Sequence, residues 1–216
     1  MRFLSLFLIV ASVTAGDSVA PVGAAAVWNP AAGVLAATHA ACDGSPERMS
    51  ECFLERMRAA GASPEAVAFT ESAGGLQYLR DFHETGRVDV VWAVSPFRAN
   101  TNDVIDLVNG DPAILDVDDR RFLAPAVFEN GAGYGAIRAA HPSVTPFPGD
   151  RHTRRAVERS TPPGGGQRFV LGEDLRDGCH ACAILGKARV AFDFDLAGKF
   201  RGLQVLKVQA TRAPQP

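Results

Sequence analysis

The chain has 216 residues, of which 47% are hydrophobic and 21% are charged, and its formal net charge is −2 at pH 7. A chain of this length can bury a substantial hydrophobic core. Its slight acidity excludes a general electrostatic attraction to nucleic acid or to an anionic membrane surface. We therefore expect a globular protein that does not bind nucleic acid.

The N-terminus has the pattern of a secretory signal peptide. Arg2 provides a positive start, residues 3–11 are apolar, and small residues follow. A helix that crosses a bilayer needs about 20 apolar residues, and Thr14 and Asp17 interrupt this run too early. We predict cleavage after Ala15 and a mature chain that is periplasmic or secreted and not membrane-spanning.

Two Ser-Pro-Glu triplets indicate where helices begin. In each triplet the serine can cap a helix, the proline suits the first turn, and the glutamate interacts favourably with the helix dipole. The triplet at Ser45 predicts a helix over 46–60, which Gly61 ends. The triplet at Ser63 predicts a second helix over 64–73.

Strand patterns follow the two helices, with β-branched and aromatic residues in short runs. The predicted strands are 77–83, 87–94, 104–108 and 113–117. Asn109-Gly110 stands between the last two of them. This dipeptide predicts a two-residue type I′ turn, in which both residues need a positive φ.

The rest of the chain combines a loop-rich middle with further strands. Short helices at 119–128 and 134–140 precede a possible loop or linker over 141–166, which is rich in proline and glycine. The last predicted strands are 168–171, 184–194 and 200–208. We therefore predict a signal peptide over 1–15 and a single α+β domain over 16–216. In that domain an N-terminal helical pair is followed by a mostly antiparallel β-meander.

The four cysteines are expected to form disulfides, because an exported protein folds in an oxidising compartment. Three pairings are possible, and proximity favours Cys42 with Cys52 and Cys179 with Cys182. The first of these bridges would link the first predicted helix to the loop before it and would restrict the unfolded chain. Two local disulfides are thus part of the predicted fold.

The motif Cys179-His180-Ala181-Cys182 offers several kinds of chemistry. Such a pair is a small structural disulfide, a redox dithiol or half of a zinc site. His180 and Arg176 can supply the positive charge that stabilises a redox thiolate. The residues that follow have the pattern of a strand, however, and the chain has no second C-x-x-C. We predict a structural disulfide and keep the redox pair as the alternative.

Two polar stretches are candidate binding surfaces. One is a loop between predicted strands, a place where binding residues are often found. Its candidate residues are Arg98, Asn100 and Asn102. The other is a basic stretch that can receive an anionic envelope glycan or a lipid headgroup, although such a stretch is more often a solvated loop or helix face. Its candidate residues are Arg151, Arg154 and Arg155.

The sequence contains no complete catalytic or metal-binding motif. A nucleophile elbow, a Walker loop, a dinucleotide fingerprint and an H-E-x-x-H motif are all absent. The acidic loop that begins at Asp193 has Gln204 at its twelfth position, where a calcium loop requires a bidentate glutamate. We expect neither a metal nor a cofactor.

Three stretches resemble exported proteins of unknown function from GC-rich Gram-negative bacteria. They are Pro96-Phe97-Arg98-Ala99-Asn100, Val108-Asn109-Gly110-Asp111-Pro112, and Cys179-His180-Ala181-Cys182 with Phe192-Asp193-Phe194-Asp195. This resemblance covers most of the mature chain and implies export but no activity. The spacing of Cys42 and Cys52 also resembles that of a family of periplasmic lysozyme inhibitors, over that helix alone.

These features favour a non-enzymatic periplasmic binding or interaction protein. Its expected partner is a periplasmic protein or an envelope component whose identity the sequence does not give. The alternative function is thiol–disulfide exchange by Cys179 and Cys182, with His180 beside them. A third hypothesis, a cell-envelope hydrolase, rests on the predicted location alone.

Overall fold

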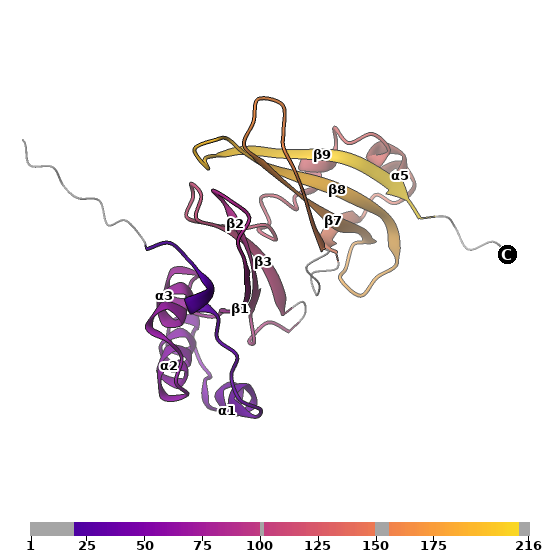
Figure 1. Ribbon diagram of the computed structural model, residues 1–216. Coiled ribbons are helices and arrows are strands. Elements are labelled where there is room, and N and C mark those ends of the chain that lie inside the picture. Colours follow the sequence, from indigo (N-terminus) through magenta and orange to yellow (C-terminus); the bar gives the residue numbers. More distant parts are fainter. Residues whose placement is uncertain (1–19, 100–101, 150–155, 212–216) are drawn as a thin grey trace, which may run out of the picture.

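The computed structural model describes residues 20–99, 102–149 and 156–211 (Figure 1). The helices are η1 (Ala24–Ala26), α1 (Val34–Ala41), α2 (Pro46–Ala59), α3 (Pro64–Ser72), α4 (Pro125–Phe128) and α5 (Tyr134–Ala140). The strands are β1 (Tyr78–His83), β2 (Asp89–Val94), β3 (Asp103–Val108), β4 (Ile114–Asp116), β5 (Val144–Pro148), β6 (Val157–Ser160), β7 (Gln167–Asp177), β8 (Ile184–Phe194) and β9 (Phe200–Ala210). The fold is α+β, as predicted. The signal peptide predicted at residues 1–15 lies outside the described residues.

Helices α2 and α3 begin at the two Ser-Pro-Glu triplets, as predicted. The Ser45 hydroxyl accepts the Arg48 N–H at 3.4 Å at the start of α2. The Ser63 hydroxyl accepts the Ala66 N–H at 3.1 Å at the start of α3. Each cap satisfies a backbone donor that has no partner inside its helix.

Two further helices differ from the sequence predictions. Helix α1 was not predicted; it begins after Gly33, which has a φ of 87°, and no side chain caps it. Its C-terminal end is linked to α2 by the Cys42–Cys52 disulfide. The helix predicted over 119–128 is limited to α4, since Pro125 is the first residue of that helix.

Strands β1–β4 form the predicted antiparallel meander, in the order β1-β2-β3-β4. The predicted type I′ turn after β3 is wrong. Asn109 has a φ of 66°, but Gly110 does not have a positive φ, and five residues separate β3 from β4. The cause is tertiary: the Asp111 N–H donates to the carbonyl of Gly198, and the Asp111 carbonyl accepts the N–H of Phe200. This loop is therefore shaped by the β8–β9 hairpin.

The second sheet has the order β5-β7-β8-β9, and β6 also pairs with β7. Strands β5 and β6 lie within 141–166, where a loop or linker was predicted, so that prediction is wrong for these residues. Thr145 of β5 pairs with Arg176, and Glu158 of β6 pairs with Val170. The prolines of β5 are tolerated because it is an edge strand. Strand β5 depends on pairing with the distant strand β7, whereas β6 forms a hairpin with β7 through the loop 161–166.

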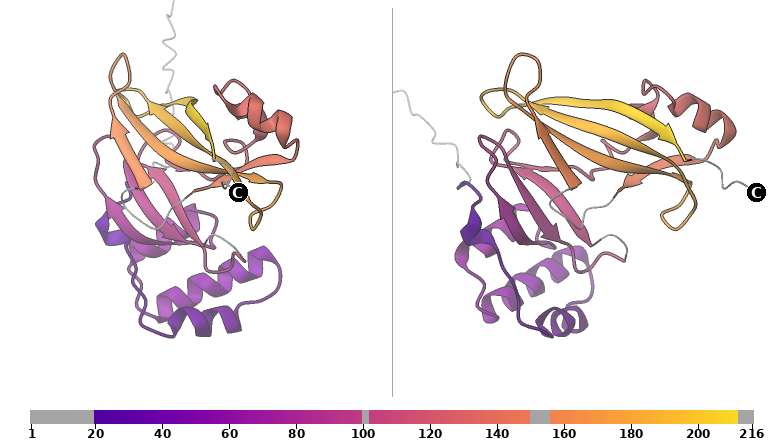
Figure 2. Two further views of the ribbon diagram at one scale, coloured as in Figure 1. Left: turned by 90° about the vertical axis from the view of Figure 1, so that its right-hand side faces the viewer. Right: turned by 45° about the vertical axis from the view of Figure 1, so that its right-hand side comes forward.

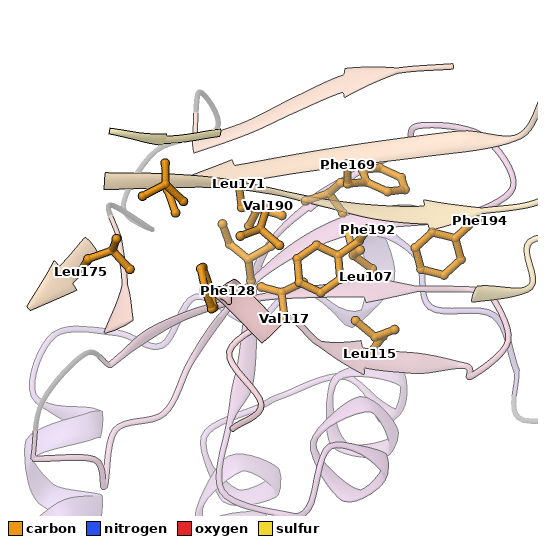
Figure 3. Close-up of a cluster of buried hydrophobic side chains, with 14 of the residues drawn as sticks. Leu107, Leu115, Val117, Phe128, Phe169, Leu171, Leu175, Val190, Phe192 and Phe194 are labelled. Carbon is orange, nitrogen blue, oxygen red and sulfur yellow. The ribbon is translucent and has the colours of Figure 1, made fainter. Parts of the chain in front are cut away.

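The two sheets share one hydrophobic core, which Figure 3 shows in close-up. Leu107, Leu115 and Val117 approach it from the first sheet. Phe128, Phe169, Leu171, Leu175, Val190, Phe192 and Phe194 approach it from α4 and the second sheet. Helix α3 lies on the opposite face of β1–β4, with α2 beside it and α1 packed against α2 (Figures 1 and 2). The β1–β4 sheet is therefore a middle layer between these helices and the second sheet.

The side chains of Gln167 and Arg87 also join the two sheets at one end. The Gln167 amide oxygen accepts the Val88 N–H at 2.7 Å, and its nitrogen donates to the carbonyls of Val88 and Thr85 at 2.9 and 3.2 Å. Arg87 Nε donates to the carbonyl of Ala197 at 3.1 Å. None of the described helices has the length and apolar character that crossing a membrane requires.

Candidate functional site

A pocket of about 560 Å³ opens beside the N-terminal segment. Its walls come from residues 20–26, from helix α3, from the turn before β2 and from the connection between β3 and β4. Much of the lining is apolar, with Val22, Phe69, Ile114 and several alanines. Its polar side chains include Glu65, Arg87, Asp89 and Asn109.

Asn109 fixes the N-terminal segment against the sheet. Its side-chain oxygen accepts the Val22 N–H at 2.7 Å, and its nitrogen donates to the Val22 carbonyl at 2.8 Å. The same nitrogen donates to Asp89 Oδ2 at 2.7 Å. Asparagine suits this position because it tolerates the left-handed backbone conformation observed here. One side chain therefore holds a wall of the pocket that is 87 residues away along the chain.

Asp89 is a buried carboxylate whose oxygen atoms are already used. Its side-chain Oδ1 accepts the N–H groups of Thr85 and Gly86 at 2.7 and 3.3 Å. Its Oδ2 accepts the amide of Asn109. With only 5% of the residue exposed, Asp89 directs its charge toward these donors rather than toward the pocket.

Arg87 is exposed, in the turn that precedes β2. The bond from its Nε to Ala197 spans from the first sheet to the β8–β9 turn. Its terminal nitrogens form no hydrogen bond or ion pair with any other residue that the structure describes. The guanidinium group of arginine is charged at physiological pH and has five N–H donors. Two N–H₂ groups of Arg87 therefore remain available to an anion at the pocket.

The C-x-x-C motif forms the tip of the β7–β8 hairpin, where Cys179 and Cys182 are joined in a disulfide. Cys179 is exposed and Cys182 is half-buried. Arg176 Nη1 donates to the Cys182 carbonyl at 3.2 Å, and the rings of His180 and Phe147 meet edge-on with centroids 5.7 Å apart. In the described part of the chain, no helix begins at this tip, so a helix dipole is not the source of any thiol activation here.

A buried acid lies on the helix-facing side of the β1–β4 sheet. Asp106 is fully buried, and its Oδ2 accepts the amide of Gln77 at 2.8 Å. Its Oδ1 has no hydrogen-bond partner among the described residues. Burial, together with the neighbouring Asp116 carboxylate, raises the pKa of Asp106 well above its ordinary value. Burial also raises the pKa of Asp116. Because Asp106 has no contact with solvent, it cannot reach a substrate.

The predicted loop residues lie near this acid pair rather than at the pocket. Arg98 is exposed, and its Nη2 lies 3.9 Å from Asp116 Oδ2. Asn102 is exposed, and its carbonyl accepts the Ser95 N–H. The remaining candidates, Asn100, Arg151, Arg154 and Arg155, lie outside the described residues.

The pocket residues Arg87 and Asp89 were not recognised in the sequence, because they stand at the start of an ordinary strand pattern. The Asn109-Gly110 dipeptide is the one local signal in this part of the sequence, and it predicts a hairpin turn. Its second role, the bonds from Asn109 to Val22 and Asp89, depends on residues that only the fold brings close.

The described residues contain no group of three or more histidine, cysteine, aspartate or glutamate side chains that could hold a metal ion. Comparisons of this chain with family models, with curated proteins and with solved structures find no match. The pocket and the cysteine hairpin are therefore the two candidate functional sites.

Proposed function

We propose that this chain is an exported, non-enzymatic binding protein that holds a small molecule in the pocket between residues 20–26, α3 and the β3–β4 connection. The observation that carries the proposal is the pocket itself. Its volume of about 560 Å³ falls in the range of about 300–1,000 Å³ that small-molecule sites occupy. An apolar lining with a few oriented polar groups is also typical of such sites.

The walls of the pocket are held in place by contacts that need no ligand. Besides the bonds of Asn109, the Ser63 hydroxyl donates to the Ala25 carbonyl at 2.7 Å, and the Trp28 N–H donates to the Leu79 carbonyl at 2.8 Å. A site that is already formed loses little conformational entropy when a ligand binds. This favours a binding role for the pocket over an accidental gap.

The same proposal places the protein in the periplasm or outside the cell. The N-terminal sequence pattern supports export, and the two disulfides are compatible with an extracytoplasmic protein. The described lining of the pocket includes no histidine or cysteine. A binding role needs neither, whereas nucleophilic hydrolysis by a triad needs a base.

A dye-binding experiment tests the proposal. Nile red, which is neutral and fluoresces in apolar surroundings, should bind the wild type at one dye per chain. Ala68 is exposed on α3 and lines the pocket, so Ala68→Trp should fill the space and abolish binding. Ala37 is exposed on α1 and does not line the pocket, which makes Ala37→Trp the matched control.

Urea unfolding would first establish that both tryptophan variants fold. Saturable binding that survives Ala68→Trp, or no binding to the wild type, would refute the pocket as a ligand site. Loss of binding in Ala68→Trp alone would support it.

Thiol–disulfide exchange is the second candidate, and the exposure of Cys179 favours it. A thiolate of a partner dithiol would attack Sγ of Cys179 and break the disulfide, and Cys182 would leave as a thiolate. The second thiol of the partner would then release Cys179, so that the partner is oxidised and this pair is reduced. A reduction potential below about −300 mV would instead identify an inert structural disulfide. The Cys179→Ser/Cys182→Ser double variant should retain Nile red binding, which separates the two functions.

A further inference from the structure

We infer that the pocket binds a single-chain amphiphile with an anionic headgroup, and that the Arg87 guanidinium pairs with that headgroup. The inference rests on the proposed function and specifies its ligand. Arg87 is the one cationic residue among the described residues that line the pocket. A planar guanidinium with two free N–H₂ groups matches the geometry of a carboxylate or a phosphate.

Arg87 is held in position by the β8–β9 turn. Its Nε donates to the Ala197 carbonyl, and its stem passes close to Gly198. A Cβ added at Gly198 would lie 2.8 Å from Arg87 Cγ, so any larger residue at this position would displace the arginine. Gly198 also has a φ of 81°, which disfavours other residues. The arginine, which lines the pocket, is therefore held in one position before a ligand arrives.

The two acidic side chains of the lining do not cancel this charge. Asp89 is buried, and both of its oxygens accept hydrogen bonds from Thr85, Gly86 and Asn109. Glu65 stands in the first turn of α3, where the partial positive charge of the helix N-terminus favours a carboxylate. No ion pair joins Arg87 to either acid or to any other residue that the structure describes, so its guanidinium can still pair with an anionic ligand.

The rest of the lining favours a hydrocarbon chain over a sugar. Val22, Phe69 and Ile114 offer apolar surface, and the alanines of residues 20–26 and α3 leave room beside it. A sugar needs many unoccupied donors and acceptors, but those of Asn109 and Asp89 are engaged within the protein. A ligand with one charged end and an apolar body satisfies the pocket without leaving polar groups unpaired.

The test compares four ligands that share a ten-carbon chain: decanoate, decyl phosphate, decanol and decylammonium. Each is used below its micelle concentration or, for decanol, below its solubility limit. Binding to the full mature chain is measured by titration calorimetry. Decanoate and decyl phosphate should bind the wild type about ten-fold more tightly than decanol, because a charge-assisted hydrogen bond adds to the same apolar contact. The difference between the two anions identifies carboxylate or phosphate as the preferred headgroup.

Arg87→Gln should weaken both anions to the affinity of decanol and leave decanol itself within about two-fold. Arg87→Lys should retain part of the preference for anions over decanol, because the positive charge remains while the two parallel N–H donors of the guanidinium are lost. Arg56, which is exposed on α2 and forms no ion pair with the other described residues, provides the control Arg56→Gln, which should change nothing.

Equal binding of decanol and decanoate, or tighter binding of decylammonium, would overturn the anionic headgroup while leaving the pocket as a binding site. An anion preference that persists in Arg87→Gln would remove Arg87 from the role. If Nile red also fails to bind, the proposed function itself is refuted, so the two failures are distinguishable.

Discussion

Asp106 is an acid whose surroundings oppose its ionisation. Burial raises the pKa of Asp106 well above that of the unfolded chain, and the Asp116 carboxylate adds to the effect. Between the unfolded and the folded pKa, the folded protein holds a proton that the unfolded chain has lost. The free energy of unfolding therefore falls as the pH rises through that window. Asp106 is thus expected to cost stability above about pH 4, where unfolded aspartate ionises.

The substitution Asp106→Asn tests whether the free energy of unfolding falls as the pH rises. The amide keeps the shape of the side chain, and its oxygen can still accept from Gln77. We expect the variant to gain stability relative to the wild type as the pH rises from about 4 to 8, because only the wild type has this proton to lose. Urea unfolding at several pH values measures the difference in the free energy of unfolding between the variant and the wild type. Acids that both proteins share contribute equally and cancel from this difference. A constant difference over that range would mean that Asp106 is ionised in the fold.

A second prediction for a single residue concerns Asn109. Asn109→Asp removes the donor to the Val22 carbonyl. It also places a carboxylate against Asp89, because Asn109 Nδ2 lies 2.7 Å from Asp89 Oδ2 in the wild type. We expect a loss of about 3 kcal/mol at pH 7, with partial recovery near pH 4 as one of the two acids takes up a proton. Urea denaturation at both pH values provides the measurement.

The control for this prediction is Asn102→Asp, because Asn102 is exposed and outside the pocket. It should change stability by less than about 0.5 kcal/mol. The same large loss at both pH values in Asn109→Asp would show that contact with the Asp89 carboxylate is not its cause.

At the scale of the element, the two serine caps share one sequence pattern but differ in their surroundings. Ser63 accepts the Ala66 N–H at 3.1 Å and donates to the Ala25 carbonyl at 2.7 Å, which lies on the wall of the pocket. Ser45 is exposed and accepts the Arg48 N–H at 3.4 Å. The Ser63 cap therefore links α3 to another segment, whereas the Ser45 cap acts only within α2.

We expect Ser63→Ala to reduce stability by about 1–2 kcal/mol and Ser45→Ala by about 0.5 kcal/mol. Thermal unfolding of the two variants side by side gives the comparison, since proline and glutamate follow the serine in both. Ser63→Ala should also weaken Nile red binding, because residue 25 is part of the wall. Equal losses in the two variants would indicate that the bond to Ala25 contributes nothing.

At the scale of the whole molecule, Gln167 joins the two sheets outside their shared core. Its amide oxygen accepts the N–H of Val88, and Val88 is fully buried. Gln167→Ala leaves that donor without a partner, so we expect a loss of about 2–3 kcal/mol. Gln209→Ala, on exposed β9, is the control and should cost less than about 0.5 kcal/mol. Chemical denaturation quantifies both, and similar values for the two would argue that the sheets are held together by the core alone.

Some parts of the fold depend on residues that are neighbours in the sequence, and others depend on contacts between residues far apart in it. The signals that predicted α2, α3 and strands β8 and β9 act over a few residues, and the structure confirms these elements. The Cys42–Cys52 and Cys179–Cys182 disulfides join residues 10 and 3 positions apart, and proximity was sufficient to pair them. Caps, side-chain alternation and short loops depend on neighbouring residues, so they can be seen in the sequence.

Local sequence patterns were therefore sufficient to predict these helices, strands and disulfides, and the α+β class that they imply. Contacts between distant segments account for the rest: β5 exists through pairing with β7, and the 109–113 loop takes its shape from the β8–β9 hairpin. They also form the pocket, which needs Val22 beside Asn109 and Arg87 beside Ala197. Those partners lie 87 and 110 positions apart. A contact at that separation is set by the packing of whole layers, and no local pattern encodes it.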